Sequence, residues 1–346
     1  MRVVGNRLAT RFITSYIKEE KSMRIRLIAL FLCAFLLASC APAAQPTDAL
    51  APQNDDSLLL GYSQLGSESN WRIGNTRSIQ QAAQSSGVQL MFDNAEQKQE
   101  KQIKAIRSFI AYQVDVIAFS PIVEDGWDNV LIEAKEAGIP VLLVDRSIKT
   151  SDDSLYAGFI GSDFLSEGRK AGEFLLERTR DMDEVNIVEI TGTVDSTPMR
   201  QRSEGFRDAI RGNEKYQIIA SVTGDFMRSK GKESMEKLLL YYHNINVLYT
   251  HNDQMTLGAI EAIEAVGLKP GKDIIVISVD GEQEAVDLLK QGKINCIVEC
   301  TPNLGPTVIR LAQTLASGGS IDRVTYSDET VFSEYDDVSA IAPRGY

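Results

Sequence analysis

Histidine, paired cysteines and glycine-rich nucleotide motifs are scarce or missing in this sequence of 346 residues. It has two histidines, His243 and His251, neither of them close in sequence to Cys296 or Cys300, so no metal site is expected. The stretch GYSQLGSESN (61–70) lacks the third glycine of G-x-G-x-x-G, which argues against a dinucleotide cofactor. A glycosidase needs two carboxylates at a fixed separation, which a sequence cannot establish. We therefore expect a protein that is not an enzyme and has no catalytic residues, metal or cofactor.

Cysteines are also few, and the two in the body of the chain are not placed to pair. Cys296 and Cys300 lie in INCIVECTP, a strand-like stretch. Four residues of strand separate their Cα atoms by about 13 Å, whereas a disulfide requires about 7 Å or less. We expect both to be buried free thiols.

No apolar run is long enough to span a bilayer. The longest one, from Leu27 to Leu37, has eleven residues and follows two arginines, which is typical of a signal peptide. It ends in Leu37-Ala38-Ser39-Cys40, which resembles a bacterial lipobox in which Cys40 is lipidated; a plain signal peptide is the alternative. We expect residues 1–39 to be a signal peptide with an upstream extension at 1–22, and residues 40–57, rich in Ala and Pro, to be the lipidated Cys and a flexible tether.

The chain also lacks a basic surface for nucleic acid. Its net charge is −12, and residues 1–39 contribute +5, so the remainder carries −17. Such a body repels phosphates. An export signal also stands where a transcription regulator would carry its helix-turn-helix, so we expect no nucleic-acid partner.

Strand-like and helix-like segments alternate along the body of the chain, which predicts parallel sheets covered by helices on both faces. Ten strands are at the upper limit of what one open sheet usually contains, so two sheets are favoured. No helix is predicted between Asp145 and Tyr156, so we expect the chain to change sheets near 156–163. The predicted strands are 58–63, 88–92, 114–120, 139–145, 156–162, 185–191, 216–222, 246–251, 273–280 and 294–299.

Polar side chains stand where several of these strands end. In open parallel sheets, ligands bind beyond the carboxyl ends of the strands. The alternative for each residue is an ordinary loop or a helix N-cap. As a set, the acids, arginine and amides suit a neutral polyhydroxylated ligand, whose hydroxyls both donate and accept hydrogen bonds. The residues are Ser63, Gln64, Asp145, Arg146, Asn252, Asp253, Asp280 and Glu299, with Trp71 and Phe226 as aromatic walls for a sugar or, alternatively, as core residues.

Seven segments, in this order along the chain, resemble the sugar-binding proteins of ABC importers, of the ribose- and galactose-binding type and closest to the galactofuranose-binding branch. They are GSESNWR (66–72), PVLLVDRSI (140–148), MRQRSEGF (199–206), GDFMRSKGKE (224–233), HNDQMTLGAI (251–260), GLKPGKDIIVISVDG (267–281) and VECTPN (298–303). Pro198, Met199 and Cys300 depart from the family pattern.

The resemblance implies the fold of a type I periplasmic binding protein, with two Rossmann-like lobes joined by three crossovers. Lobe 1 is expected at 58–161 plus 301–329, and lobe 2 at 162–300 plus 330–346. Carried over to this sequence, the ligand-binding residues are Ser67, Glu68, Trp71, Arg72, Asp145, Arg146, Arg202, Phe226, Asn252, Asp280 and Glu299.

The resemblance also implies partners and a location. The expected ligand is a monosaccharide of the galactose type, and the expected partner is an ABC permease. A sugar sensor that signals to a membrane kinase or chemoreceptor is the alternative. We expect an exported monomer, held by its lipid on the outer side of the cytoplasmic membrane.

Overall fold

The computed structural model describes residues 57–346. The predicted signal peptide, Cys40 and nearly all of the predicted tether lie outside these residues. Within residues 57–346, no helix has the length and apolar character needed to cross a membrane.

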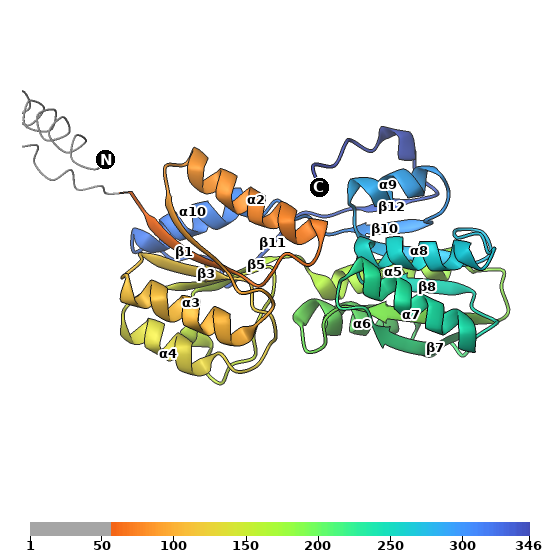
Figure 1. The fold of residues 1–346 in the computed structure, drawn as a ribbon, viewed down its shortest axis with the longest axis horizontal. Coiled ribbons are helices and arrows are strands. Elements are labelled where there is room, and N and C mark those ends of the chain that lie inside the picture. Colours follow the sequence, from red (N-terminus) through yellow and green to blue (C-terminus); the bar gives the residue numbers. More distant parts are fainter. Residues whose placement is uncertain (1–56) are drawn as a thin grey trace, which may run out of the picture. The chain divides into compact units, whose positions relative to one another are not determined.

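The first sheet is entirely parallel, with strand order β11-β5-β4-β3-β1-β2. Helices α2 (Asn70–Ser85) and α10 (Gly305–Ala316) pack on one face, and α3 (Gln99–Ala111) and α4 (Asp128–Glu136) pack on the other (Figure 1). Strands β3 and β4 are buried on both faces, as their continuous apolar runs predict. The strands are β1 (Leu59–Gln64), β2 (Gln89–Asn94), β3 (Val116–Phe119), β4 (Val141–Val144), β5 (Gly158–Gly161) and β11 (Val324–Tyr326).

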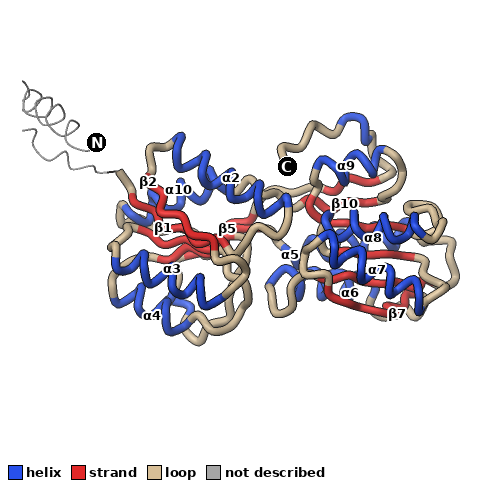
Figure 2. Tube along the Cα trace, viewed as in Figure 1, coloured by secondary structure: helices blue, strands red, loops and turns tan. Residues whose placement is uncertain are grey.

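The second sheet has the order β12-β10-β9-β8-β6-β7 and is parallel except for β12, which runs antiparallel to β10. Helices α5 (Phe164–Arg178) and α6 (Thr197–Ile210) pack on one face; α7 (Arg228–Tyr241), α8 (Asp253–Ala265) and α9 (Gln283–Lys290) pack on the other (Figure 2). The strands are β6 (Val185–Thr191), β7 (Tyr216–Thr223), β8 (Val247–Thr250), β9 (Ile275–Asp280), β10 (Cys296–Glu299) and β12 (Val331–Ser333).

Three connections carry the chain between the two sheets: from β5 into α5, from β10 into α10, and from β11 into β12. This is the predicted fold class, with two α/β lobes joined by three crossovers. Strand β5 pairs with β4 and so belongs to the first sheet. The chain therefore changes sheets after Gly161, near the end of the expected interval 156–163. The stretch between Asp145 and Tyr156, where no helix was predicted, lies inside the first lobe and contains the short 3-10 turn Asp153–Leu155.

All ten predicted strands are present, and residues 57–346 contain two further ones, β11 and β12, that were missed. Each of these has three residues and lies at a sheet edge, so neither carries a sustained apolar pattern. Helix α3 lies between the predicted strands 88–92 and 114–120, and α8 lies between 246–251 and 273–280, as the predicted alternation of strands and helices requires.

Helices α5 and α6 approach each other unusually closely because glycines face each other across the contact. A Cβ atom on Gly168 would lie 2.2 Å from the carbonyl oxygen of Arg202, and one on Gly205 would lie 2.0 Å from that of Leu165. Only glycine avoids these clashes. The close packing brings the Arg202 side chain beside Glu167 and Phe164, at the end of the sheet that faces the site.

Candidate ligand-binding site

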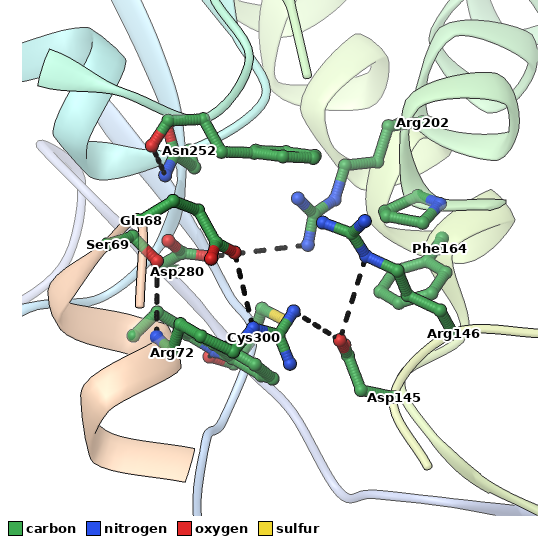
Figure 3. A pocket seen from close by; sticks show the side chains of 13 residues that line it. Glu68, Ser69, Arg72, Asp145, Arg146, Phe164, Arg202, Asn252, Asp280 and Cys300 are labelled. Atoms are coloured by element: carbon green, nitrogen blue, oxygen red, sulfur yellow. Dashed lines mark hydrogen bonds and ion pairs between the residues drawn. The ribbon is translucent and has the colours of Figure 1, made fainter. Parts of the chain in front are cut away.

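One pocket lies at the carboxyl ends of strands from both sheets, where open α/β sheets bind ligands. The cavity volume is about 30 Å³, well below the usual range for small-molecule pockets, so the pocket is nearly closed. The first lobe contributes the turn and helix after β1 and the loop after β4, and the second lobe contributes the rest (Figure 3). The lining residues are Glu68, Ser69, Trp71, Arg72, Asp145, Arg146, Phe164, Pro198, Arg202, Phe226, Asn252, Asp280 and Cys300.

Nine of the eleven predicted ligand-binding residues line this pocket, and two do not. Ser67 is exposed and is not part of the lining. Glu299 is turned to other partners: its carboxylate is paired with Arg344 and accepts a hydrogen bond from the backbone N–H of Thr330. Strand-end position and the family resemblance both selected Glu299, but in the structure its carboxylate forms a salt bridge with the distant C-terminal segment.

In the first lobe, Arg72 is held between two carboxylates. Its Nη2 lies 2.6 Å from Oδ2 of Asp145, and its Nε lies 3.2 Å from Oε1 of Glu68. Burial alone would lower the pKa of Arg72, but the two carboxylates outweigh burial and raise it. The second oxygen of Glu68, Oε2, is buried and has no hydrogen-bond partner. Arg72 is thus fixed and charged, while Glu68 keeps an unused acceptor.

Arg146 is buried with few partners. Its Nη1 donates to the carbonyl oxygen of Ile122 at 3.0 Å, its Nε has no hydrogen-bond partner, and the oxygen Oδ2 of Asp145 is 3.9 Å away. Burial, together with the positive charge of Arg72, lowers the pKa of Arg146 to about 10. A buried, unsatisfied guanidinium is costly unless something completes its hydrogen bonds.

The second lobe holds Arg202 in a comparable way. Its Nε lies 2.6 Å from Oε2 of Glu167, its Nη1 donates to the carbonyl oxygen of His251 at 2.5 Å, and its Nη2 is 4.0 Å from Oδ1 of Asp280. Burial raises the pKa of Asp280, and the nearby acids Asp253 and Glu282 add to this against the opposing effect of Arg202.

Each of the three pocket arginines also lies over an aromatic ring. The guanidinium carbon is 4.7 Å from the ring centroid of Trp71 for Arg72, 5.2 Å from that of Phe226 for Arg146, and 5.1 Å from that of Phe164 for Arg202. These cation–π contacts orient the charged planes and place apolar rings beside the polar groups. The indole Nε1 of Trp71 is not free for a ligand, because it donates to the carbonyl oxygen of Cys300 at 2.7 Å.

The backbone is strained at three lining residues. Asp145, Phe226 and Asp280 have positive φ angles of 65°, 62° and 121°. Residues with side chains rarely adopt such angles, and strain of this kind clusters at functional sites. These turns set the direction of three side chains: Asp145 after β4, Phe226 after β7 and Asp280 at the end of β9.

Asn252 has two roles. Its Oδ1 accepts from the backbone N–H of Met255 at 3.0 Å and caps helix α8, and its Nδ2 donates to the carbonyl oxygen of Phe226 at 3.3 Å. The N-cap alternative considered for this residue is therefore correct as local structure. Asn252 also lines the pocket.

Sequence reasoning missed four lining residues. Ser69 lies in the segment GSESNWR and caps helix α2. Pro198 and Cys300 were noted only as departures from the family pattern, and the free, buried state expected for Cys300 and Cys296 is confirmed. Phe164 begins α5 directly after the first crossover, and no motif in the sequence marked it.

The pocket balances three carboxylates (Glu68, Asp145, Asp280) against three guanidinium groups (Arg72, Arg146, Arg202). A charged ligand would upset this balance. A neutral molecule rich in hydroxyl groups can donate to the unused carboxylate oxygen of Glu68 and accept from Nε of Arg146. Its C–H faces can lie on the aromatic rings.

Two α/β lobes joined by three crossovers, with a polar pocket at the strand ends, define a two-lobe solute-binding protein. Residues 61–320 match the family described as "Periplasmic binding protein domain", and the chain belongs to this family.

Individual relatives agree over nearly the whole folded body. The galactofuranose-binding protein YtfQ of Escherichia coli (strain K12) is 41% identical over 301 residues, which are 86% of this chain and 93% of the relative. A structure from Mycobacterium smegmatis in complex with β-D-fucofuranose shares 47% identity at a TM-score of 0.80, covering 82% of this chain and 93% of that one. The binding component of the arabinose ABC transporter from Shewanella sp. ANA-3, bound to α- and β-L-arabinofuranose, shares 42% identity at a TM-score of 0.78, covering 82% and 93%.

Proposed function

We propose that this protein is an exported receptor that captures a monosaccharide in its furanose form, galactofuranose or a related sugar, and delivers it to an ABC permease. The observation that carries the proposal is the pocket between the lobes, which is lined by three acids and three arginines. Two buried atoms in it, Oε2 of Glu68 and Nε of Arg146, have no hydrogen-bond partner. The relatives support the ring form, because galactofuranose, fucofuranose and arabinofuranose share a five-membered ring.

The proposed residues have distinct roles. Glu68, Asp145 and Asp280 accept hydrogen bonds from sugar hydroxyls, while Arg146 and Arg202 donate to them. Trp71 and Phe226 cover the C–H faces of the ring. Six to eight hydrogen bonds at a net of about 1 kcal/mol each correspond to micromolar affinity, or about −8 kcal/mol.

A panel of sugars measured by thermal shift tests the proposal. A ligand present at about 100 times its Kd stabilises the protein by about 2.7 kcal/mol. Two isomers of anhydrogalactitol decide the ring form: the first is locked in a five-membered ring and the second in a six-membered ring. We expect only the first to raise Tm. A rise with the second alone would overturn the furanose assignment, and a rise with an amino acid but no sugar would overturn the function.

Transport is favoured over sensing because a relative of 42% identity is the binding component of an ABC transporter. Uptake of labelled sugar distinguishes the two: a deletion strain should lose uptake if the protein serves a permease. A strain that keeps uptake but loses a sugar-dependent response would identify a sensor.

The lipid anchor at Cys40 belongs to the same proposal and lies outside the described residues. Cys40→Ser should release the protein from the membrane fraction, and mass spectrometry of the wild-type N-terminus should find a lipid on Cys40. Gel filtration of the released protein should give the mass of a monomer.

A further inference from the structure

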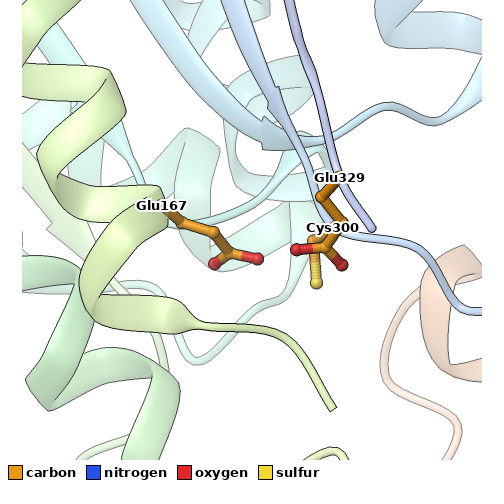
Figure 4. Close-up of side chains that lie close together, drawn as sticks. All are labelled: Glu167, Cys300 and Glu329. Carbon is orange, nitrogen blue, oxygen red and sulfur yellow. The ribbon is translucent and has the colours of Figure 1, made fainter. Parts of the chain in front are cut away.

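Three residues, one from each region where the chain passes between the sheets, meet next to the pocket. Glu167 lies in the first turn of α5, Cys300 follows β10, and Glu329 lies between β11 and β12. One ligand atom from each residue lies within 4.8 Å of the others, and the three side chains point toward one another (Figure 4). These residues are far apart in the sequence, and none was assigned a role in ligand binding.

One side chain in this cluster is buried without a partner. Glu167 is 1% exposed, and its Oε1 has no hydrogen bond, whereas its Oε2 is held by Arg202. A carboxylate oxygen buried without a donor is costly. It therefore indicates a missing partner in this position.

The other two residues are held in place from outside the cluster. Oε1 of Glu329 accepts hydrogen bonds from Ser162 Oγ at 2.6 Å, from the backbone N–H of Thr301 at 2.9 Å and from Ser327 Oγ at 2.9 Å. Ser162 Oγ also lies 3.3 Å from Sγ of Cys300. Outer hydrogen bonds of this kind fix the ligands of metal sites.

Acidic groups outnumber basic groups around the cluster. The acidic groups are Glu167, Cys300, Glu329 and nearby Asp280. The basic groups beside them are Arg202 and Lys170, whose Nζ donates to the backbone carbonyl of Glu329.

We infer that Glu167, Cys300 and Glu329 form a binding site for one Zn²⁺ ion that links the three crossovers. An equilateral triangle with sides of 4.8 Å has its centre about 2.8 Å (4.8/√3) from each corner. Zinc binds thiolate sulfur at about 2.3 Å and carboxylate oxygen at about 2.0–2.2 Å, so inward shifts of less than about 1 Å complete the site. The thiolate selects zinc over Ca²⁺ and Mg²⁺, which prefer all-oxygen sites. Cys300 also lines the pocket, which gives the ion a route of entry.

Zinc binding tests this inference independently of any sugar. The purified protein is freed of metal, titrated with Zn²⁺ against a chromophoric chelator, and compared with Cys300→Ser, Glu329→Gln and the matched control Cys296→Ser. Cys296 is also a buried free thiol, but it lies outside the cluster. We expect one ion per molecule for the wild type and C296S, at least about tenfold weaker binding for C300S and E329Q, and a higher Tm of the wild type with zinc.

Cobalt substitution gives a second readout, and its decisive measurement is made on the wild-type protein. Co²⁺ bound to the wild type should show a thiolate-to-cobalt charge-transfer band in the near ultraviolet, which C296S keeps. Absence of this band in the wild type, or zinc binding that is equally tight in C300S, would overturn the inference. The cluster would then hold shared protons instead of a metal.

Discussion

At the scale of single residues, the pocket is built from charges that are buried before any ligand arrives. Arg72 and Arg202 each have a close carboxylate, at 2.6 Å in both cases, but Arg146 does not. The free protein therefore bears an electrostatic cost at Arg146. A sugar hydroxyl that accepts from its Nε would recover part of that cost on binding.

Replacing Arg146 by Met should separate binding from stability. The loss of a charged hydrogen bond costs about 1.5–3 kcal/mol, so sugar affinity should fall about 10- to 150-fold by calorimetry. Removing a buried, poorly paired charge should stabilise the sugar-free protein by about 1–3 kcal/mol in urea unfolding. Arg107→Met, at an exposed ion pair with Glu133, is the control and should change neither quantity. Unchanged affinity of R146M would remove Arg146 from the site.

A buried acid next to the site should make stability depend on pH. Burial and the neighbouring Glu282 raise the pKa of Asp253, although its oxygens accept hydrogen bonds from Ser278 Oγ and from the N–H groups of Gly281 and Glu282. Above the unfolded value of about 4, the folded state binds more protons here than the unfolded state, so stability falls as pH rises.

Asp253→Asn removes this titration while keeping an acceptor for the two N–H groups. Between about pH 5 and about pH 8, the free energy of unfolding of D253N should decline less than that of the wild type in urea titrations. Parallel curves for the two proteins would show that Asp253 is already ionised at the lower pH.

At the scale of elements, the turn after β9 depends on the C-terminal segment. Asp280 and Gly281 both have positive φ. Tyr346 Oη donates to the carbonyl oxygen of Asp280 at 3.1 Å, and Arg344 Nε donates to that of Gly281 at 3.1 Å. Gln283 closes the contact, since its backbone N–H donates to the carbonyl oxygen of Tyr346 at 2.9 Å. The segment 344–346 thus holds Asp280 without lining the pocket.

Arg344→Ala should weaken sugar binding through Asp280. Arg344 bonds to Gly281 and pairs with Glu299, so its loss frees the turn. At about 1 kcal/mol for each lost hydrogen bond, affinity should fall about 5- to 30-fold, and the double variant with Asp280→Asn should lose less than the sum of the two effects. Arg310→Ala, exposed on α10, is the control. Strict additivity would show that Arg344 does not act through Asp280.

At the scale of the whole molecule, segments outside the three crossovers also join the lobes: loops of the first lobe contact helix α6 of the second. Glu124, which follows β3, accepts from Arg200 of α6 with an Nη2–Oε1 distance of 2.9 Å. Ser147 and Thr197 exchange two hydrogen bonds, at 3.1 and 2.9 Å. These contacts favour the state in which the lobes meet.

Arg200→Ala should lower affinity by destabilising that state without touching the pocket. A half-exposed pair contributes about 0.2–1 kcal/mol, so Kd should rise up to about fivefold, mainly through faster sugar dissociation in stopped-flow measurements. Arg211→Ala, an exposed arginine on the same lobe, should leave both rates unchanged. An effect of R200A on the association rate alone would contradict this reading.

Local patterns predicted a large part of the fold and site. Buried parallel strands have continuous apolar runs, so Val141–Val144 was recognisable, and so were the polar residues Asp145 and Arg146 that follow it. Which charged side chains pair with each other was not recognisable from the sequence. Asp145 pairs closely with Arg72, not with its neighbour Arg146, because residues adjacent in the chain need not point the same way.

The sequence by itself determined the alternation of strands and helices, the polar strand ends and the family, because each depends on residues close together in the chain or on motifs in a fixed order. Only the tertiary structure decided that Glu299 faces Arg344, that Phe164 lines the pocket, and that Glu167, Cys300 and Glu329 meet. Those contacts join segments far apart in the chain, and their geometry is set by how the two sheets and three crossovers pack.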